Sequence, residues 1–481
     1  MADLYDLIII GAGSGGLTAA RFAATLGAKV ALIEKGRVGG DCTWTGCVPS
    51  KALLKAARVA HDVRTASHFG ISAPALVVDM ARIRACIQEA VARVYQLETP
   101  ETLEREGIEV VLGEARFVDP TMIRVGDRTL CGKNFLLTTG AHPVRPDLPG
   151  LNETPFLTYE TLFENDRLPD RLLILGAGPI GMEMAQAYQR LGAQVSVLGD
   201  TLLPKEEPEA QAILRKVLER EGVRFVTGRA EYVSFAAGII TAQVGGHSFA
   251  GDMLLVATGR APNVEGLELE KAGVTYSPTG IAVNDQLQTS IKHIYAAGDC
   301  AGGCGYQFTH FAGWQAFQAA RNALLVGSSR GFSEVVPWCT FTDPEVAHVG
   351  MTEAQARSKH GDAVKILYRD AAQNDRAVCE NDLDGFIKIV HLSDGHILGA
   401  TIVAARAGEM ITECALAIQH SLKIGDLATT IHAYPTYSSA IQILASEEAI
   451  RETFAGFGGK VIKTLSGLPT ASHPPNPQEN P

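Results

Sequence analysis

Apolar residues occur in short runs between glycine-rich turns along the first half of the chain. One run, Leu7–Ile10, is followed by the turn GAGSGG (11–16), by a helical segment to about Leu26, and by a second run at Val30–Ile33. Short apolar runs that alternate with helical segments in this way are typical of buried parallel strands in β-α-β units. The pattern predicts a doubly wound α/β nucleotide-binding domain.

The same pattern is repeated later in the chain. A strand is expected at Leu172–Leu175, then the turn GAGPIG (176–181), a helix to about Leu191 and a strand at Val195–Leu198. Because the two copies stand far apart in the sequence, we assign them to two separate Rossmann-type domains.

Proline and glycine mark the joints between domains. The pattern changes near Gly331–Pro337 to strands at 335–341, 386–391 and 399–403, with one long helix from about Gly408. We therefore expect a first nucleotide-binding domain at 1–150 and 286–333, a second at 151–285, an α+β domain at 334–460, and a flexible tail at 461–481.

Composition and charge narrow the function classes. The 481 residues suggest about three domains, and the formal net charge of −11 argues against nucleic acid and anionic membrane partners. We find no apolar run long enough to span a bilayer and no secretory signal. Nine cysteines without such a signal do not indicate a disulfide framework. We expect a cytoplasmic protein in which a disulfide is catalytic rather than structural.

The first glycine fingerprint carries binding chemistry. Gly11 makes the tight turn, Gly13 lets the backbone approach a pyrophosphate, and Gly16 lets the helix pack closely on the strand. The helix N-terminus offers amides to the phosphates, and Glu34 can accept from ribose hydroxyls. A purely structural turn is the alternative, but the strand–turn–helix context favours a dinucleotide.

The second fingerprint also stands between a predicted strand and a predicted helix, with glycines at Gly176, Gly178 and Gly181. Gly199 stands where the first copy has Glu34, and Asp200 follows. A 2′-phosphate calls for a nearby arginine, and none stands there; the closest basic residue along the chain is Lys205. NADH is favoured, with NADPH possible.

Two cysteines carry the redox chemistry in the segment GGDCTWTGCVPSK (39–51). Cys42 and Cys47 are five positions apart, and a helix start after a Gly-Gly loop stabilises a thiolate. Such a pair can store two electrons as a dithiol, and a flavin can pass it the two electrons of a hydride from NADH. The alternative, two buried structural cysteines, is less favoured because both dinucleotide fingerprints are present.

Further segments match a known family in order: TTGA (138–141), the GxGxxGxE ending at Glu183, ATGRAPN (257–263), YAAGD (295–299) and TDPEVAHVG (342–350). From Leu4 to about Ile450 the chain resembles the class I pyridine nucleotide-disulfide oxidoreductases, which include lipoamide dehydrogenase, glutathione reductase and mercuric reductase. The resemblance implies a homodimer, with FAD in the first domain, NAD(P)H in the second, and the third serving dimerisation.

The resemblance also implies roles for single residues. Cys47 would face the flavin and Cys42 would meet the substrate, while Lys51 would sit by the flavin N5 and pair with Glu183. A solvated lysine is the alternative for Lys51. Asp299 would bind the ribityl chain. Further cofactor contacts are implied at Ala115, Gly140 and Gly259.

The segment AYPTYSS (433–439) departs from the family. Lipoamide dehydrogenase and glutathione reductase have a histidine–glutamate dyad there, whereas this chain has Tyr434 and Ser439, with His432 two places early. A tyrosine titrates near 10 and is a poor base. Mercuric reductase also has a tyrosine here, yet it ends in a cysteine pair that hands over the metal, and this tail has none.

His310, in FTH (308–310), stands where the family usually has proline, or tyrosine in mercuric reductase. Because a histidine titrates near 6.5, we expect His310 and Tyr434 together to replace the missing dyad, with packing of His310 against the flavin as the alternative. Cys300 and Cys304 form a second pair, expected to be ordinary small residues rather than an auxiliary redox or metal site. The isolated cysteines are expected in the core; they are Cys86, Cys131, Cys339, Cys379 and Cys414.

The sequence thus predicts a mercuric-reductase-like, FAD-dependent NAD(P)H oxidoreductase that passes electrons through Cys42–Cys47 to a disulfide, a metal or another small acceptor. Two alternatives stay open: a dihydrolipoamide dehydrogenase with a replaced dyad, and a low-turnover flavoprotein redox sensor.

Overall fold

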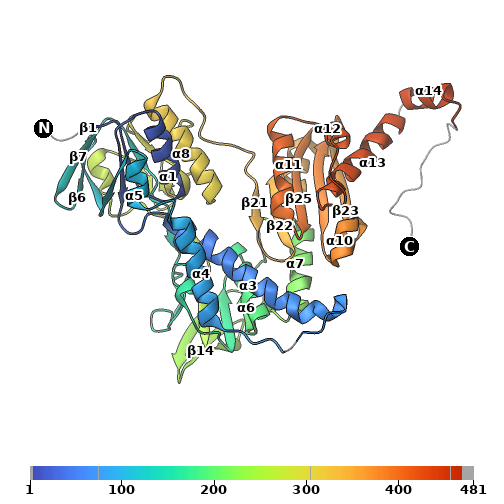
Figure 1. The fold of residues 1–481 in the computed structure, drawn as a ribbon, viewed down its shortest axis with the longest axis horizontal. Helices are drawn as coiled ribbons and strands as arrows, with labels where there is room; N and C mark the ends of the chain where they lie inside the picture. The colour runs from blue at the N-terminus through green and yellow to red at the C-terminus, as the bar shows by residue number, and fades with distance from the viewer. Residues whose placement is uncertain (1–3, 74, 304, 456, 469–481) are drawn as a thin grey trace. The chain divides into compact units, whose positions relative to one another are not determined.

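The computed structural model describes residues 4–73, 75–303, 305–455 and 457–468 (Figure 1). The chain divides into two compact units, one of Met1–Pro204 with Leu218–Glu334, the other of Lys205–Val217 with Val335–Pro481.

The first parallel sheet of the first unit is built around the strand predicted at Leu7–Ile10. Its order is β20-β8-β2-β3-β4, with every neighbouring pair parallel; the strands are β2 (Leu7–Ile10), β3 (Val30–Glu34), β4 (Ile108–Leu112), β8 (Phe135–Leu137) and β20 (Ile294–Ala296). Helices α1 (Ser14–Thr25) and α8 (Thr309–Leu324) pack alanines into the same core as β2 and β3. Strands covered by helices are buried, which explains their continuous apolar runs.

The second parallel sheet repeats this plan. Its order is β12-β11-β10-β16, with strands β10 (Arg171–Leu175), β11 (Gln194–Leu198), β12 (Arg224–Val226) and β16 (Met253–Val256). Helix α6 (Pro179–Leu191) follows β10. The fold class predicted for this half of the chain, two parallel nucleotide-binding sheets, is confirmed.

The remaining elements of the first unit connect these sheets. Helices α2 (Gly40–Trp44), α3 (Cys47–Thr65), α4 (Met80–Tyr95) and α5 (Pro100–Arg105) lie between β3 and β4 in the chain. The smaller sheets contain β1 (Leu4–Tyr5), β5 (Ala115–Asp119), β6 (Met122–Val125), β7 (Arg128–Gly132), β9 (Ala141–Pro143), β13 (Tyr232–Ala236), β14 (Ile239–Val244), β15 (His247–Gly251), β17 (Arg260–Pro262), β18 (Tyr276–Ser277) and β19 (Gly280–Ile281).

The second unit contains one antiparallel sheet and its covering helices. The sheet order is β21-β22-β25-β24-β23, with strands β21 (Trp338–Thr340), β22 (Glu345–Gly350), β23 (Val364–Asp370), β24 (Phe386–Leu392) and β25 (Ile397–Ala404). Helices α11 (Ala407–Gln419) and α13 (Ser439–Ala455) share a core with β24 and β25. The shorter helices are α9 (Glu353–His360), α10 (Asp375–Glu380), α12 (Ile424–Thr429) and α14 (Phe457–Leu465).

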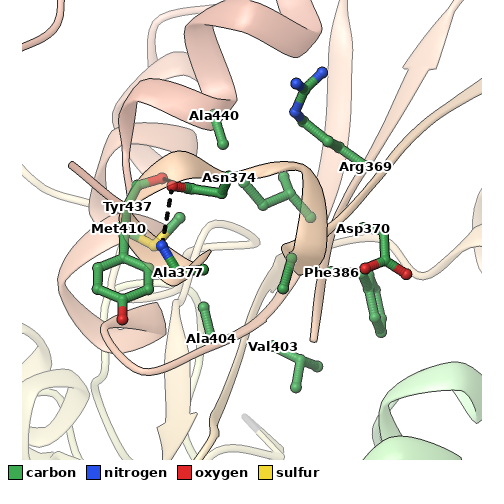
Figure 2. Close-up of a pocket in the computed structure, with 12 residues that line it drawn as sticks. Arg369, Asp370, Asn374, Ala377, Phe386, Val403, Ala404, Met410, Tyr437 and Ala440 are labelled. Atoms are coloured by element: carbon green, nitrogen blue, oxygen red, sulfur yellow. Dashed lines mark hydrogen bonds between the residues drawn. The ribbon is translucent and has the colours of Figure 1, made fainter. Parts of the chain in front are cut away.

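The segment 433–439 is anchored to α10 within this unit. Asn374 caps α10 by accepting from the amides of Arg376 and Ala377, and its side-chain amide donates to the Tyr437 carbonyl at 3.0 Å (Figure 2). Met410 of α11 lines the same small pocket. This hydrogen bond fixes the backbone at Tyr437, three residues after Tyr434.

Two boundaries differ from those expected from the sequence. Residues up to Leu465 form α14, so part of the 461–481 tail is helical; Val461, Ile462 and Leu465 recur at helical spacing. Residues 469–481 lie outside the described chain. Residues Lys205–Val217, expected in the 151–285 domain, belong to the second unit.

Lys388 explains why Lys205–Val217 belongs to the second unit. It lies on β24 with a side chain 2% exposed, and its Nζ is 2.7 Å from Glu353, 2.9 Å from Glu209 and 3.4 Å from Glu207. A buried charge needs such partners, and two of them come from the 205–217 segment. That segment, which starts α7 (Pro208–Arg220), is therefore held to the sheet of the second unit.

Lys388→Met should destabilise the second unit, because it leaves the buried carboxylate of Glu207 without its counter-charge. Loss of one partner of a buried ion pair costs about 3 kcal/mol. Urea unfolding followed by circular dichroism measures the change. Lys365→Met, an exposed lysine on the neighbouring strand β23, is the matched control and should stay close to the parent. Equal stability of the two variants would contradict the assigned role of Lys388.

Candidate active site

The two cysteines lie on either side of a break between helices. Cys42 is in α2, and Cys47 is the first residue of α3, with Gly46 between the two helices. A Cβ on Gly46 would lie 2.9 Å from the Asp41 carbonyl oxygen, so this close turn favours glycine. The sequence predicted one helix start, after the Gly-Gly loop; the structure has two helices, and Cys47 lies at the N-terminus of the second, where the helix dipole favours a thiolate.

The two cysteines differ in how readily their thiols lose a proton. The hydrogen bond from the Cys42 thiol is the main cause that lowers the pKa of Cys47 to about 6, with further lowering by the Thr309 hydroxyl and by Lys51. The same hydrogen bond, with burial, raises the pKa of Cys42 far above its ordinary value. At neutral pH the reduced pair therefore holds a thiolate on Cys47 and a proton on Cys42.

Lys51 lies one helical turn beyond Cys47 on α3. Its Nζ is 3.0 Å from a carboxylate oxygen of Glu183, whose side chain is 8% exposed on α6, and 3.3 Å from the Ser50 hydroxyl. The ion pair implied by the family resemblance is thus present, and it orients a positive charge near the cysteine pair.

The first glycine loop has the shape that a dinucleotide requires. Gly11 has φ +106°, and a Cβ on Gly16 would lie 1.9 Å from the Gly11 carbonyl oxygen. A Cβ on Gly40 would lie 2.6 Å from the Gly13 Cα, so two backbones meet there. Gly13 starts α1 without a side-chain cap, and Glu34, at the end of β3, accepts from the Ala12 and Gly36 amides at 2.8 and 2.7 Å. The loop fits a bound pyrophosphate and ribose.

The second loop is built alike. A Cβ on Gly181 would lie 2.1 Å from the Gly176 carbonyl oxygen, whereas one on Gly178 would meet nothing within 4 Å. Open space at Gly178 and the uncapped start of α6 suit a second pyrophosphate.

The charge environment of Asp200 differs from the one expected. Arg229, which follows β12, places its Nε 2.6 Å from Asp200, and both side chains are largely exposed. The expectation that no arginine stands near Asp200 was wrong. Strands β11 and β12 are hydrogen-bonded neighbours, so the residues beyond their ends meet although they are far apart in sequence.

The other residues assigned to cofactor binding lie in the first unit. Ala115 is buried at the start of β5. Gly140 and Gly259 have φ values of +70° and +142°, in loops after β8 and before β17. The Asp299 carboxylate is 11% exposed and 2.9 Å from Arg260 Nη1; burial raises the pKa of Asp299, and Arg260 opposes this.

Thr309 contacts the redox pair from the segment FTH. Its Oγ1 is 3.3 Å from Cys47 Sγ. The sequence predicted a role for the neighbouring His310 but not for Thr309. His310, the second residue of α8, is exposed, and its ring stacks on Phe308 with centroids 5.4 Å apart.

Tyr434 and His432 have partners within the second unit. Tyr434 is 70% exposed, and its hydroxyl donates to Asp375 at 2.6 Å. His432 Nε2 is 2.9 Å from Glu413, and Nδ1 is 3.0 Å from the Thr430 carbonyl oxygen. Burial opposes protonation, but the Glu413 carboxylate raises the pKa of His432. Both ring nitrogens therefore face acceptors, in a pairing that the sequence did not reveal.

The remaining cysteines are divided between core and surface. Cys300 is fully buried, with its sulfur near the carbonyl oxygens of Leu137 and Ala297, as expected of a small packed residue; Cys304 lies outside the described residues. Cys414 is buried, and Cys131 and Cys339 are partly buried. The core expectation was wrong for Cys86 and Cys379, which are exposed on α4 and α10.

The described residues contain no group of three or more histidine, cysteine, aspartate or glutamate side chains arranged to hold a metal ion. Among the helices that the structure describes, none is both long and apolar enough to cross a bilayer.

Comparisons with known proteins agree with the geometry. The model of the family "Pyridine nucleotide-disulphide oxidoreductase" matches residues 5–323, and that of its dimerisation domain matches residues 336–445. A mercuric reductase of Bacillus cereus is 36% identical over 450 residues, which cover 91% of this chain and 70% of that protein. A dihydrolipoyl dehydrogenase of Thermus scotoductus is 36% identical over 449 residues, 91% of this chain and 96% of that protein.

A solved structure shows the same similarity. The HOCl-induced flavoprotein disulfide reductase RclA from Escherichia coli superposes with a TM-score of 0.82 at 28% identity, covering 92% of this chain and 99% of that one.

The thiolate on Cys47 predicts a pH dependence. In the reduced protein, alkylation of Cys47 by iodoacetamide should be half-maximal near pH 6 and constant above about pH 7, because the thiolate exists above its pKa. Quantitative mass spectrometry of the peptides measures the rate, with exposed Cys379 as the internal reference. Cys42→Ala should move the midpoint upward. A parent midpoint near 8.5, the value of a free cysteine, would contradict the arrangement.

The Arg229–Asp200 pair predicts the choice of nicotinamide cofactor. Arg229→Ala should lower kcat/KM for NADPH about tenfold, the effect of ~1.4 kcal/mol, because the arginine beside Asp200 that could hold a 2′-phosphate is removed. The same change should leave kcat/KM for NADH within about twofold. Asp200→Asn should raise kcat/KM for NADPH. Arg224→Ala, an exposed arginine on β12, is the control. An unchanged ratio in Arg229→Ala would exclude this role.

Proposed function

We infer that this chain, which belongs to the pyridine nucleotide-disulphide oxidoreductase family, uses its Cys42–Cys47 pair to pass electrons from NAD(P)H to a soft metal ion. The observation that carries the proposal is the placement of Cys42 and Cys47 on either side of the break between α2 and α3, with Lys51 one turn further along α3. Members of this family are enzymes that use FAD and NAD(P)H; when bound, these cofactors supply electrons two at a time.

The electron balance of the pair follows from its protonation. Opening a Cys42–Cys47 disulfide takes up two electrons and one proton, and leaves a thiol on Cys42 and a thiolate on Cys47. The hydrogen bond between the two sulfurs stabilises this singly protonated state. Lys51 and the start of α3 add positive potential on the side of the thiolate.

A metal acceptor suits these residues because its reduction consumes no proton. A divalent soft ion bound by both sulfurs takes two electrons, the disulfide re-forms, and the Cys42 proton is released. Thiolates are the ligands that such ions prefer. The mercuric reductases among the relatives support the same class of acceptor.

A disulfide acceptor makes a further demand. One half of a disulfide substrate leaves as a thiolate that an acid must protonate. The residues at or near the positions of the family's histidine–glutamate dyad are held in other hydrogen bonds. Tyr434 donates to Asp375, the Ser439 hydroxyl donates to the Thr436 carbonyl, and both nitrogens of His432 face acceptors. For such a substrate we propose His310 as the proton donor, and Tyr434 would join it only by giving up its hydrogen bond to Asp375.

The cofactor contacts and the assembly are part of the proposal. The FAD residues are Gly11, Gly13, Gly16, Glu34, Lys51, Ala115, Gly140, Asp299 and His310, and the nicotinamide cofactor residues are Gly176, Gly178, Gly181, Asp200 and Gly259. The match to a dimerisation domain supports a homodimer, in which Tyr434 would complete the redox site of the second protomer. We place the enzyme in the cytoplasm.

An acceptor screen with the purified holoenzyme tests the proposal. We expect turnover with Hg²⁺ buffered by excess thiol, measured by NADH or NADPH oxidation and by release of elemental mercury, to exceed turnover with lipoamide or glutathione disulfide at least about tenfold, a difference of ~1.4 kcal/mol in the barrier. Cys42→Ser should abolish it, and Cys86→Ser, at an exposed thiol of α4, should not.

Other outcomes are equally informative. Faster turnover with lipoamide than with Hg²⁺ would contradict the proposal and indicate a dihydrolipoamide dehydrogenase. Reduction by NADH without turnover of any acceptor would indicate a redox sensor.

A further inference from the structure

Arg260 joins two carboxylates that lie far apart in the sequence. It is the first residue of β17, and its side chain is 22% exposed. Nη2 is 2.6 Å from Asp41 Oδ2, and Nη1 is 2.9 Å from Asp299 Oδ2. One planar guanidinium thus bridges the residue directly before Cys42 and the aspartate assigned to the ribityl chain.

Tyr159 fixes the plane of this guanidinium. The Arg260 Nε donates to the Tyr159 hydroxyl at 3.2 Å, and the guanidinium carbon lies 5.2 Å from the centre of the tyrosine ring. The hydroxyl itself donates to Asp41 Oδ2 at 3.3 Å. Burial, the largest cause, raises the pKa of Tyr159, so the phenol stays neutral and adds no negative charge.

The charges of this cluster require Arg260. Asp299 is almost fully buried, and a buried carboxylate without a partner is costly. Asp41 lies in α2, next to a pair whose reduced state carries a thiolate. Like charges repel, and although the side chain of Asp41 is 39% exposed, which weakens the effect, an uncompensated Asp41 would still destabilise the reduced pair relative to the disulfide.

We propose that Arg260 is a positioning residue for the Cys42–Cys47 pair: it anchors α2 through Asp41 and cancels the negative charge beside Cys42. The inference rests on the proposed function, because it presumes that the pair cycles between dithiol and disulfide. A guanidinium serves both carboxylates at once through its fork of donors, which a lysine ammonium does not do.

The equilibrium of the pair with dithiothreitol redox buffers tests the role. The holoenzyme is equilibrated, acid-quenched and alkylated, and the Cys42–Cys47 peptides are quantified by mass spectrometry. Arg260→Met should shift the equilibrium toward the disulfide about tenfold, or about 30 mV for two electrons. Arg260→Lys should shift it less.

Charge compensation separates this role from simple packing. Asp41→Asn combined with Arg260→Met should return the equilibrium to within about threefold of the parent, because the charge directly before Cys42 is gone, whereas Asp299 lacks its partner in both Arg260→Met variants. Asp41→Asn alone should shift it toward the dithiol. The control is Arg167→Met, which removes another arginine–aspartate pair of the same unit, Arg167–Asp252, and should shift nothing.

Each contrary result has one meaning. An Arg260→Met equilibrium equal to the parent, or one that Asp41→Asn does not reverse, overturns the role of Arg260. If Arg260→Met does not fold, Asp41→Asn decides alone, and no shift in that variant overturns the role. A parent pair that forms no disulfide in any buffer overturns the proposed function itself.

Discussion

The hydrogen bond between the Cys42 thiol and the Cys47 sulfur imposes a demand on the surrounding backbone. Two residues five positions apart would not face each other on one regular helix, so the chain ends α2 and starts α3 between them. Gly46 permits the turn because no Cβ collides with the Asp41 carbonyl. The break also gives Cys47 the N-terminus of a long helix, a position that favours a thiolate in addition to the hydrogen bond from Cys42.

The charged residues around the pair are arranged to suit one negative sulfur. Lys51, held by Glu183, lowers the pKa of Cys47, and Arg260 neutralises Asp41 on the other side. Each cation is oriented by a carboxylate from a segment distant in the sequence. The site therefore depends on the packing of α3 against α6 and on the placement of β17, not on the cysteine segment alone.

The second unit bears on which acceptor this chemistry serves. Where lipoamide dehydrogenase and glutathione reductase have an acid–base dyad, this chain has a tyrosine bonded to Asp375, and its nearest histidine is bonded to Glu413. These bonds stabilise the 430–439 segment and occupy the groups that would otherwise move a proton. A reduction without proton delivery to the acceptor agrees with that arrangement.

Several features were determined by the sequence alone, because each depends on residues close together in the chain. The glycine turns, the strands at Leu7–Ile10 and Leu172–Leu175, and the helix start after the Gly-Gly loop at 39–40 need only local backbone geometry. Strands β22 and β23 were not predicted, although their residues, EVAHVG (345–350) and VKILYRD (364–370), include the β-branched and aromatic types that favour strands.

Apart from the Lys51–Glu183 pair, which the family resemblance implied, the charge pairs discussed above were decided by the tertiary structure alone. The pairs Arg229–Asp200, Arg260–Asp41 and His432–Glu413, and the attachment of 205–217 through Lys388, join side chains from separate elements. A charged residue carries no local signal of its partner, because Coulomb attraction depends on distance in space and not on separation along the chain.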